Sequence, residues 1–166
     1  MQSVPASETI KGPAGAVPEL RAFAAELATR PLPVGVRYYV FGDSQRSEAD
    51  AERYRTADPP TSRARWGESP HHWRPALALD VYPILSDGTV SNAPRDYAQI
   101  VDVAEAQGLQ SGRTFNDWPH VQIPNWRSRT AAAPAARPGI LAALLILAVA
   151  GVVAVRDFVT NRTSSA

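Results

Sequence analysis

The sequence contains no cysteine, and this absence excludes several kinds of site at once. Without thiols the chain can form no disulfide, no cysteine nucleophile and no thiolate-bound zinc. A metal ion would therefore have to bind histidine and carboxylate side chains, a donor set that is more typical of a catalytic than of a structural zinc.

An excess of charge of either sign is also missing. The net charge is +1 at pH 7, and Lys11 is the only lysine, so arginine supplies nearly all of the positive charge. A nucleic-acid-binding surface normally requires clustered positive charge, and we expect no nucleic-acid partner. The N-terminus has no basic start followed by an apolar run, so no signal peptide is predicted.

Long hydrophobic runs are absent except at residues 139–155, which are uninterruptedly apolar and end at Arg156. Their length reaches the lower limit of a bilayer span, and the pattern predicts a transmembrane helix. A buried core helix is the alternative, but the Ala/Pro/Arg-rich segment before the run favours a separate element. The expected organisation is a flexible N-terminus (1–18), one folded domain (19–126), a linker (127–138), the membrane helix (139–155) and a polar tail (156–166).

Hydrophobic periodicity within the domain alternates between helix and strand. Apolar residues recur at helical spacing in residues 19–29 and 96–107, and a shorter helix with Ser47 as its N-cap is predicted for residues 47–55. Strands rich in β-branched and aromatic residues are predicted for 34–41, 77–85 and 120–123. This alternation predicts an α+β fold, a small antiparallel sheet with helices packed on one side.

The most informative stretch of the sequence is 115–122, in which Asp117 stands three positions before His120. Pro119 fixes its own φ and pushes Trp118 toward extended geometry, so the two side chains are joined by a stiff backbone. Such an arrangement suits a metal ligand beside its general base.

The other two histidines, His71 and His72, lie in the second informative stretch, residues 69–83. Paired histidines in a proline-rich loop are, taken alone, more often surface residues than ligands. Asp80 follows them within a predicted apolar strand, where a carboxylate is expensive to bury without a partner. A zinc ion would be such a partner.

Three motifs occur in order: Ser-x-His at 69–71, Ala-x-Asp at 78–80, and Asp-x-Pro-His-x-Gln at 117–122. Together they resemble the zinc D-Ala-D-Ala carboxypeptidase / L-alanyl-D-glutamate peptidase family, which includes many phage endolysins. The resemblance runs from about residue 34 to residue 122. It implies an α+β fold of the kind predicted above and a catalytic zinc ion.

The resemblance also implies roles for individual residues. His71, Asp80 and His120 correspond to the zinc ligands, with His72 as the alternative first ligand, because the first histidine and Asp80 lie further apart here than in the family's common form. Asp117 corresponds to the general base that takes a proton from water and returns it to the leaving amine.

Two further residues match the family less closely. Arg46, at the start of a predicted helix, matches an arginine that faces the active site and would stabilise the oxyanion or hold a substrate carboxylate; a solvent-exposed arginine at a helix start is the alternative. Ser69 is either a substrate contact or an ordinary loop hydroxyl.

The function that the resemblance implies is hydrolysis of peptidoglycan stem peptides, as in an endolysin that cuts the L-Ala–D-Glu bond. A D-Ala-D-Ala carboxypeptidase and a membrane-anchored, non-catalytic cell-wall-binding module are the alternatives. We expect anchoring in the inner membrane of a bacterial host through residues 139–155. Arginines flank this run on both sides, and their distribution leaves its orientation open.

Overall fold

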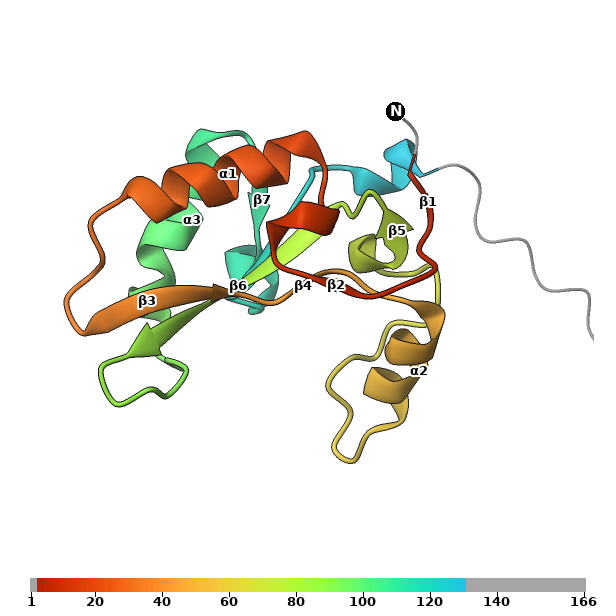
Figure 1. Ribbon diagram of the computed structural model, residues 1–166, viewed down its shortest axis with the longest axis horizontal. Coiled ribbons are helices and arrows are strands. Elements are labelled where there is room, and N and C mark those ends of the chain that lie inside the picture. Colours follow the sequence, from red (N-terminus) through yellow and green to blue (C-terminus); the bar gives the residue numbers. More distant parts are fainter. Residues whose placement is uncertain (1–2, 131–166) are drawn as a thin grey trace, which may run out of the picture. The chain divides into compact units, whose positions relative to one another are not determined.

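The computed structural model describes residues 3–130, and within that range the predicted α+β class is confirmed (Figure 1). The helices are α1 (Pro18–Thr29), α2 (Glu48–Thr56) and α3 (Ala98–Ala106). The main antiparallel sheet has the strand order β3 (Val36–Phe41), β6 (Ala78–Leu85), β8 (His120–Gln122), β7 (Gln110–Ser111). Two small antiparallel pairs join β1 (Val4–Pro5) to β5 (Trp73–Arg74) and β2 (Ile10–Lys11) to β4 (Asp43–Gln45).

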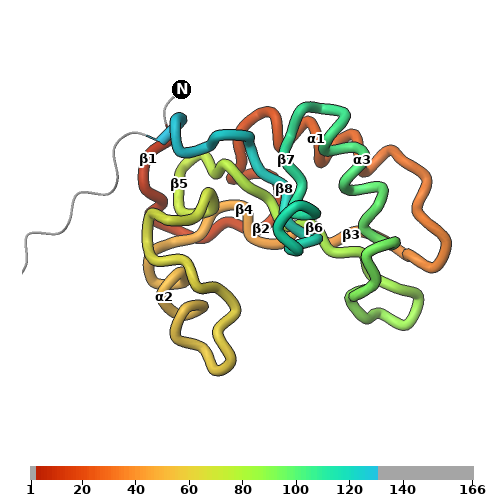
Figure 2. Tube along the Cα trace, turned by 180° about the vertical axis from the view of Figure 1, so that it is seen from behind, coloured from red at the N-terminus to blue at the C-terminus, as the bar shows by residue number. Residues whose placement is uncertain are grey.

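The hydrophobic core lies between one face of the main sheet and the layer formed by α1 and α3 (Figures 1 and 2). Successive side chains of a strand point to opposite faces, so Leu79 and Val81 of β6 enter this core together with Phe23 of α1 and Ile100 of α3. Fully burying a side chain of this size contributes about 1.5–3 kcal/mol. Asp80 lies between the two core residues and therefore points to the other face.

Helix α2 departs from the predicted packing of all helices on one side. Its predicted cap is confirmed, because the Ser47 side chain accepts a hydrogen bond from the Asp50 N–H at 3.3 Å. Ala51 is its only buried residue, so α2 has almost no apolar face to bury against the sheet. In both views it lies below the sheet, away from α1 and α3 (Figures 1 and 2).

The folded domain extends beyond the predicted limits of 19–126. Residues 3–17, which the sequence assigned to a flexible N-terminus, supply β1 and β2 and bury Ala6, Ala16 and Val17. At the other end, Arg129 of the predicted linker donates a hydrogen bond to Glu19 Oε1 at 2.8 Å. Strands of two residues carry no detectable periodicity, which is why sequence patterns gave no sign of them.

None of the helices between residues 3 and 130 is long and apolar enough to cross a membrane. The predicted transmembrane helix, at residues 139–155, lies outside the described residues.

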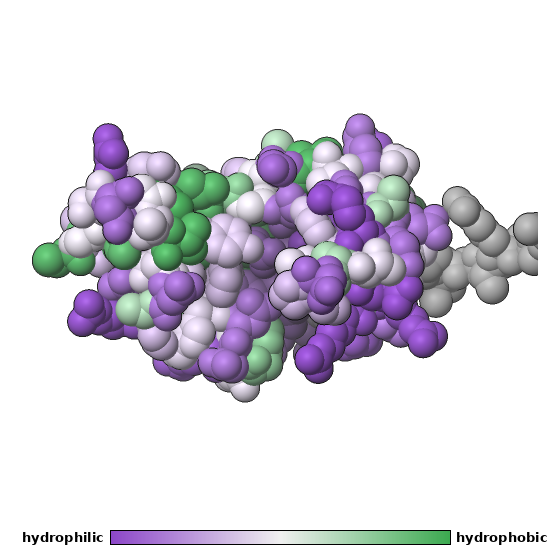
Figure 3. Space-filling model, turned by 90° about the horizontal axis from the view of Figure 1, so that it is seen from below, coloured by the Kyte–Doolittle hydropathy of each residue, from purple (hydrophilic) through white to green (hydrophobic). Residues whose placement is uncertain are grey.

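The face of the domain opposite to α1 and α3 is largely hydrophilic and is hollowed near its middle (Figure 3). This is the face toward which Asp80 points.

Candidate metal centre

The pairing of β6 with β8 brings Asp80 and His120 together, because the two residues are direct partners in the antiparallel register. Residues directly opposite each other on paired strands share a face, with Cβ atoms about 4.5–5.5 Å apart. The Asp80 Oδ1 and His120 Nδ1 atoms lie 3.0 Å apart. Two segments separated by forty positions in the sequence thus supply one compact acid–imidazole pair.

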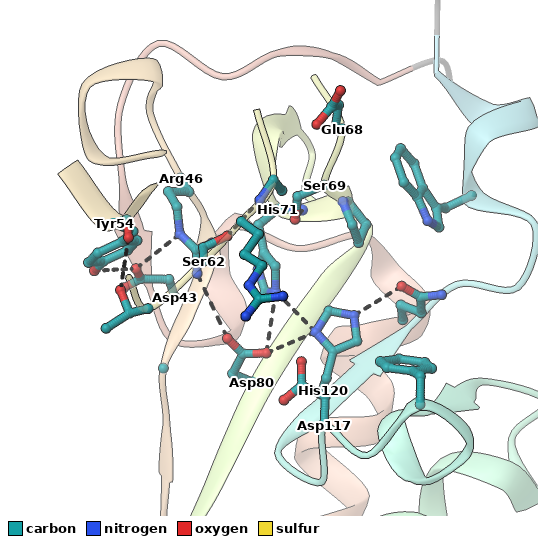
Figure 4. A pocket seen from close by; sticks show the side chains of 18 of the residues that line it. Asp43, Arg46, Tyr54, Ser62, Glu68, Ser69, His71, Asp80, Asp117 and His120 are labelled. Carbon is teal, nitrogen blue, oxygen red and sulfur yellow. Dashed lines mark hydrogen bonds and ion pairs between the residues drawn. The ribbon is translucent and has the colours of Figure 1, made fainter. Parts of the chain in front are cut away.

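His71 reaches the same place from the short 3-10 helix η2 (Pro70–His72). Ser69 caps this turn by accepting a hydrogen bond from the His71 N–H at 3.4 Å, and the Arg46 N–H donates to the His71 carbonyl at 2.7 Å. The His71 Nε2 atom then lies 3.3 Å from Asp80 Oδ1 and 3.3 Å from His120 Nδ1 (Figure 4). One ligand atom from each of the three residues falls within 4.8 Å of the others.

The outer nitrogen of each imidazole is occupied by an oxygen acceptor. His71 Nδ1 donates to the Ser44 carbonyl at 2.9 Å, and His120 Nε2 donates to Gln122 Oε1 at 3.0 Å. The Gln122 amide is oriented in turn, because its nitrogen donates to Gln110 Oε1 at 2.7 Å. A neutral imidazole with one N–H bound in this way presents a lone pair at its other nitrogen, which is how metal-ligating histidines are usually fixed.

The inner lone pairs of His71 and His120 consequently converge beside the Asp80 carboxylate. Two facing lone pairs repel each other unless a cation or a proton lies between them. The donor set of two imidazole nitrogens and one carboxylate oxygen is one that binds catalytic zinc, with a fourth position left for water. The residues present therefore fit a divalent metal ion, and the outer hydrogen bonds orient them toward it.

The electrostatics of the cluster keep Asp80 ionised. Burial opposes its ionisation, but His71 and His120 beside it outweigh burial and lower the pKa of the carboxyl. The pKa of His120 is raised. Burial alone would lower it, but the Asp80 carboxylate, which accepts a hydrogen bond from the protonated ring, outweighs burial. An anionic carboxylate at this point is what a divalent cation requires.

Asp117 lies at the edge of the cluster, and Figure 4 shows its carboxylate next to Asp80 and His120. The turn that carries it needs a glycine at 112, since a Cβ there would stand 1.8 Å from the Asp117 carbonyl oxygen. The backbone then curls so that the His120 N–H donates to the Asp117 carbonyl at 2.9 Å. Desolvation by the cleft walls, and the nearby charge of Asp80, raise the pKa of Asp117 despite the opposing effect of His120. A raised pKa makes a carboxylate a better proton acceptor near neutral pH.

Arg46 is buried in the site rather than exposed at the start of α2. Its side chain is 11% exposed, and its Nη2 lies 3.9 Å from Asp80 Oδ2 while its Nε lies 3.5 Å from Asp43 Oδ2. The solvent-exposed alternative for Arg46 is therefore wrong.

The structure separates the two adjacent histidines. His72 is fully buried beside Trp66, on which its ring stacks at 5.0 Å, and its Nδ1 accepts a hydrogen bond from the Gly67 N–H at 3.0 Å. Burial, with Arg46 and His71 nearby, lowers the pKa of His72 to about 4, so the ring is neutral and is not part of the cluster. Ser69 lines the cleft, and its hydroxyl caps η2.

Sequence reasoning missed the groups that orient the ligands and Arg46: Ser44, Asp43, Tyr54 and Gln110. Gln122 was noticed only as part of a motif, although one signal was available. It stands two positions after His120 on the same strand and hence on the same face. The Ser44 contact is made by a backbone carbonyl, which no side-chain pattern reveals.

The three candidate ligands line one cleft of about 870 Å³ together with Asp117 and Arg46, and its walls also include residues that the sequence did not single out: Tyr82, Glu68 and Arg63. A cleft of this size accommodates a short peptide, and the cluster lies within its lining. Comparison of the chain with protein-family models and with curated proteins finds no match in either.

Proposed function

We propose that this chain is a zinc-dependent peptidase that cleaves the stem peptides of peptidoglycan. One observation carries the proposal: the ligand atoms of His71, Asp80 and His120 converge beside a second carboxylate, Asp117, which is not one of the grouped ligands. The peptidoglycan substrate is taken from the motif resemblance at residues 69–71, 78–80 and 117–122.

The chain's own residues divide the chemistry among them. A zinc ion held by His71, Asp80 and His120 would polarise a water molecule and lower its pKa from about 15.7 toward about 7. Asp117 is the residue we assign to accept a proton from the attacking water and to deliver it to the nitrogen of the leaving amine. His71, Asp80 and His120 hold their donor atoms in place through the Ser44 and Gln122 hydrogen bonds, so little reorganisation is needed.

Arg46 supports the developing negative charge. Its guanidinium lies 3.9 Å from the Asp80 carboxylate and lines the same cleft. In a water-poor site a fixed cation of this kind stabilises an oxyanion or binds a substrate carboxylate, a contribution of about 3 kcal/mol in comparable sites.

The bond that we assign is the one between L-Ala and D-Glu. Asp at position 117, where related enzymes also use Glu, and the motif's terminal Gln122 resemble the endopeptidase branch of the family. The competing reaction is removal of a terminal D-Ala by a carboxypeptidase. The endopeptidase would release a new D-Glu amine, whereas the carboxypeptidase would release free D-Ala.

We further propose that the enzyme is held at the inner membrane of a bacterial host by residues 139–155. Protease treatment of intact spheroplasts tests on which side the domain lies. Digestion of residues 3–130 from outside would place the domain on the outer side of the membrane, and digestion only after lysis would place it on the cytoplasmic side.

The test of the activity uses the full-length chain, purified in mild detergent and incubated with peptidoglycan sacculi, with mass spectrometry of the released muropeptides. Chelator-sensitive fragments with a new D-Glu amine support the endopeptidase, and loss of one D-Ala supports the carboxypeptidase. Asp117→Asn, which keeps the shape and removes the base, is the matched control. If the sacculi remain unchanged although the protein is folded and holds zinc, the peptidase proposal is wrong and a cell-wall-binding module takes its place.

A further inference from the structure

Arg46 lies between two carboxylates without forming a close ion pair with either. Its Nε is 3.5 Å from Asp43 Oδ2 and its Nη2 is 3.9 Å from Asp80 Oδ2 (Figure 4). Close charged hydrogen bonds of arginine span about 2.7–2.9 Å. Within the described residues, the buried Nε of Arg46 has no hydrogen-bond partner at all. Two ion pairs of this length do not by themselves fix the guanidinium in its intermediate position.

Tyr54 of α2 contacts both Arg46 and Asp43. Its hydroxyl donates a hydrogen bond to Asp43 Oδ2 at 2.9 Å, and the Arg46 guanidinium carbon lies 4.7 Å from the centre of its ring. An arginine at this distance from an aromatic ring is attracted by the ring's quadrupole. Burial, with Asp43 nearby, raises the pKa of Tyr54, so its hydroxyl stays protonated and remains a donor.

The position of Tyr54 is itself fixed by the cleft wall. Its carbonyl accepts hydrogen bonds from the N–H groups of Thr61 and Ser62, at 3.0 and 3.3 Å, and both of these residues line the cleft. These bonds fix the backbone that carries the Tyr54 side chain, and the hydrogen bond to Asp43 fixes the direction of its ring.

We propose that Tyr54 and Asp43 form a clamp that holds Arg46 away from Asp80, which leaves the carboxylate free for a metal ion and the guanidinium directed into the cleft. The inference rests on the metal site of the proposed function, and it makes Tyr54 a positioning residue. Without the clamp, Arg46 would close the short remaining gap and bind Asp80 in the two-point geometry that arginine and carboxylate favour. It would then compete with the metal ion for the same oxygens and repel it.

The clamp predicts a specific pattern of zinc affinities, which requires no substrate. The full-length chain and its Tyr54→Leu, Arg46→Ala and doubly substituted variants are titrated with zinc against a chromophoric chelator. Tyr54→Leu is expected to weaken zinc binding about tenfold, as for other groups that support metal ligands. Adding Arg46→Ala should abolish that loss, because the residue that competes for Asp80 is gone. An unchanged affinity in Tyr54→Leu, or an equal loss in the Arg46→Ala background, overturns the proposal.

Matched variants separate the clamp from a general effect on α2. Arg53 also lies over the Tyr54 ring, at 4.7 Å, yet its own ion pair is with Asp50, outside the site. Arg53→Ala should therefore leave zinc affinity unchanged, and a tenfold loss in it would overturn the proposal. If Tyr54→Leu fails to fold by circular dichroism, Tyr54→Phe and Asp43→Asn enter the same cycle. Tyr54→Phe removes the hydrogen bond to Asp43, and Asp43→Asn removes the negative charge beside Arg46. Both keep the ring, and the same dependence on Arg46 is expected.

The zinc cycle and the sacculus assay fail independently. If Tyr54→Leu weakens zinc binding equally with and without Arg46, and the protein still cleaves sacculi, the clamp is wrong and the peptidase proposal stands. If the loss of zinc affinity depends on Arg46 as predicted, but the protein leaves sacculi intact, the clamp stands and the peptidase proposal is wrong.

Discussion

The two faces of strand β6 are both covered by protein, and they contribute different interactions. On one face Leu79 and Val81 are fully buried beneath α1 and α3, where they contribute apolar contact alone. On the other face Asp80 is mostly buried among His71, His120 and Arg46, and its contribution is charge. One strand thus anchors the core through odd-numbered positions and the candidate metal centre through Asp80. The comparison implies that substitutions one residue apart should separate stability from function.

The largest expected effect comes from Asp80→Asn on the polar face. The amide keeps the size of the carboxylate but loses its charge, so the site is left with two imidazoles and no anion. Zinc should be absent from the purified protein by atomic emission, and sacculus cleavage should fall below detection. Asp102→Asn, on the exposed side of α3, is the matched control and should retain both. One zinc per chain in Asp80→Asn would contradict the assignment.

Asp117→Asn should affect catalysis and leave the metal in place, because Asp117 is not among the grouped ligand atoms. Loss of a general base lowers the rate by roughly 10²–10⁴-fold. The readouts are the initial rate of muropeptide release and the zinc content of the same preparation. Full activity in this variant would mean that another group accepts the proton.

Leu79→Ala, on the apolar face, should produce the reverse result. Truncating a fully buried leucine costs about 2–5 kcal/mol through lost contact and the cavity that remains. Denaturant unfolding should show this loss, while the folded fraction still binds one zinc ion. A variant that lost zinc without losing stability would show that the two faces are not separable.

The smallest expected effect concerns His72, the buried neighbour of His71. Its pKa lies at about 4 in the folded chain, below its ordinary value of 6.5. Above about pH 6.5 both states are neutral and its stabilisation is complete. As the pH falls toward 4, the unfolded chain binds a proton that the folded chain does not, so stability is lost.

The variant that tests this is His72→Asn, whose oxygen replaces the Nδ1 acceptor for Gly67. Measured by urea unfolding with chelator present, the wild type should lose about 2 kcal/mol more than the variant between pH 7.5 and pH 4.5. Parallel losses in the two proteins would show that His72 does not titrate in this range.

The longer elements of this fold were accessible from sequence because their burial repeats with a clear period. Helix α1 begins and ends within one residue of the predicted 19–29, and β6 within one residue of 77–85. Strands β1, β2, β5 and β7 span two residues each, too few for any period. The first three also pair only with partners that are distant in the chain. The attachment of residues 3–17 to the domain was hidden for that reason.

The candidate site was likewise predictable from the sequence only in part. The grouping of Asp80 with His120 depends on strand pairing, which the motif order suggested and the register of β6 and β8 makes explicit. The choice between His71 and His72 could not be made from spacing, because the segment between them and Asp80 contains β5, a strand of two residues whose Trp73 is buried in the core. The buried position of Arg46 depends on Asp43 and Tyr54, contacts that appear only when α2 folds back on β4.

The central claim is that His71, Asp80 and His120 bind one metal ion, and anomalous diffraction at the zinc edge from zinc-soaked crystals tests it most directly. The account predicts a single strong peak about 2.0–2.2 Å from His71 Nε2, His120 Nδ1 and an Asp80 carboxylate oxygen. A peak bonded to His72 instead, or no peak at these three atoms under stoichiometric zinc, would contradict it.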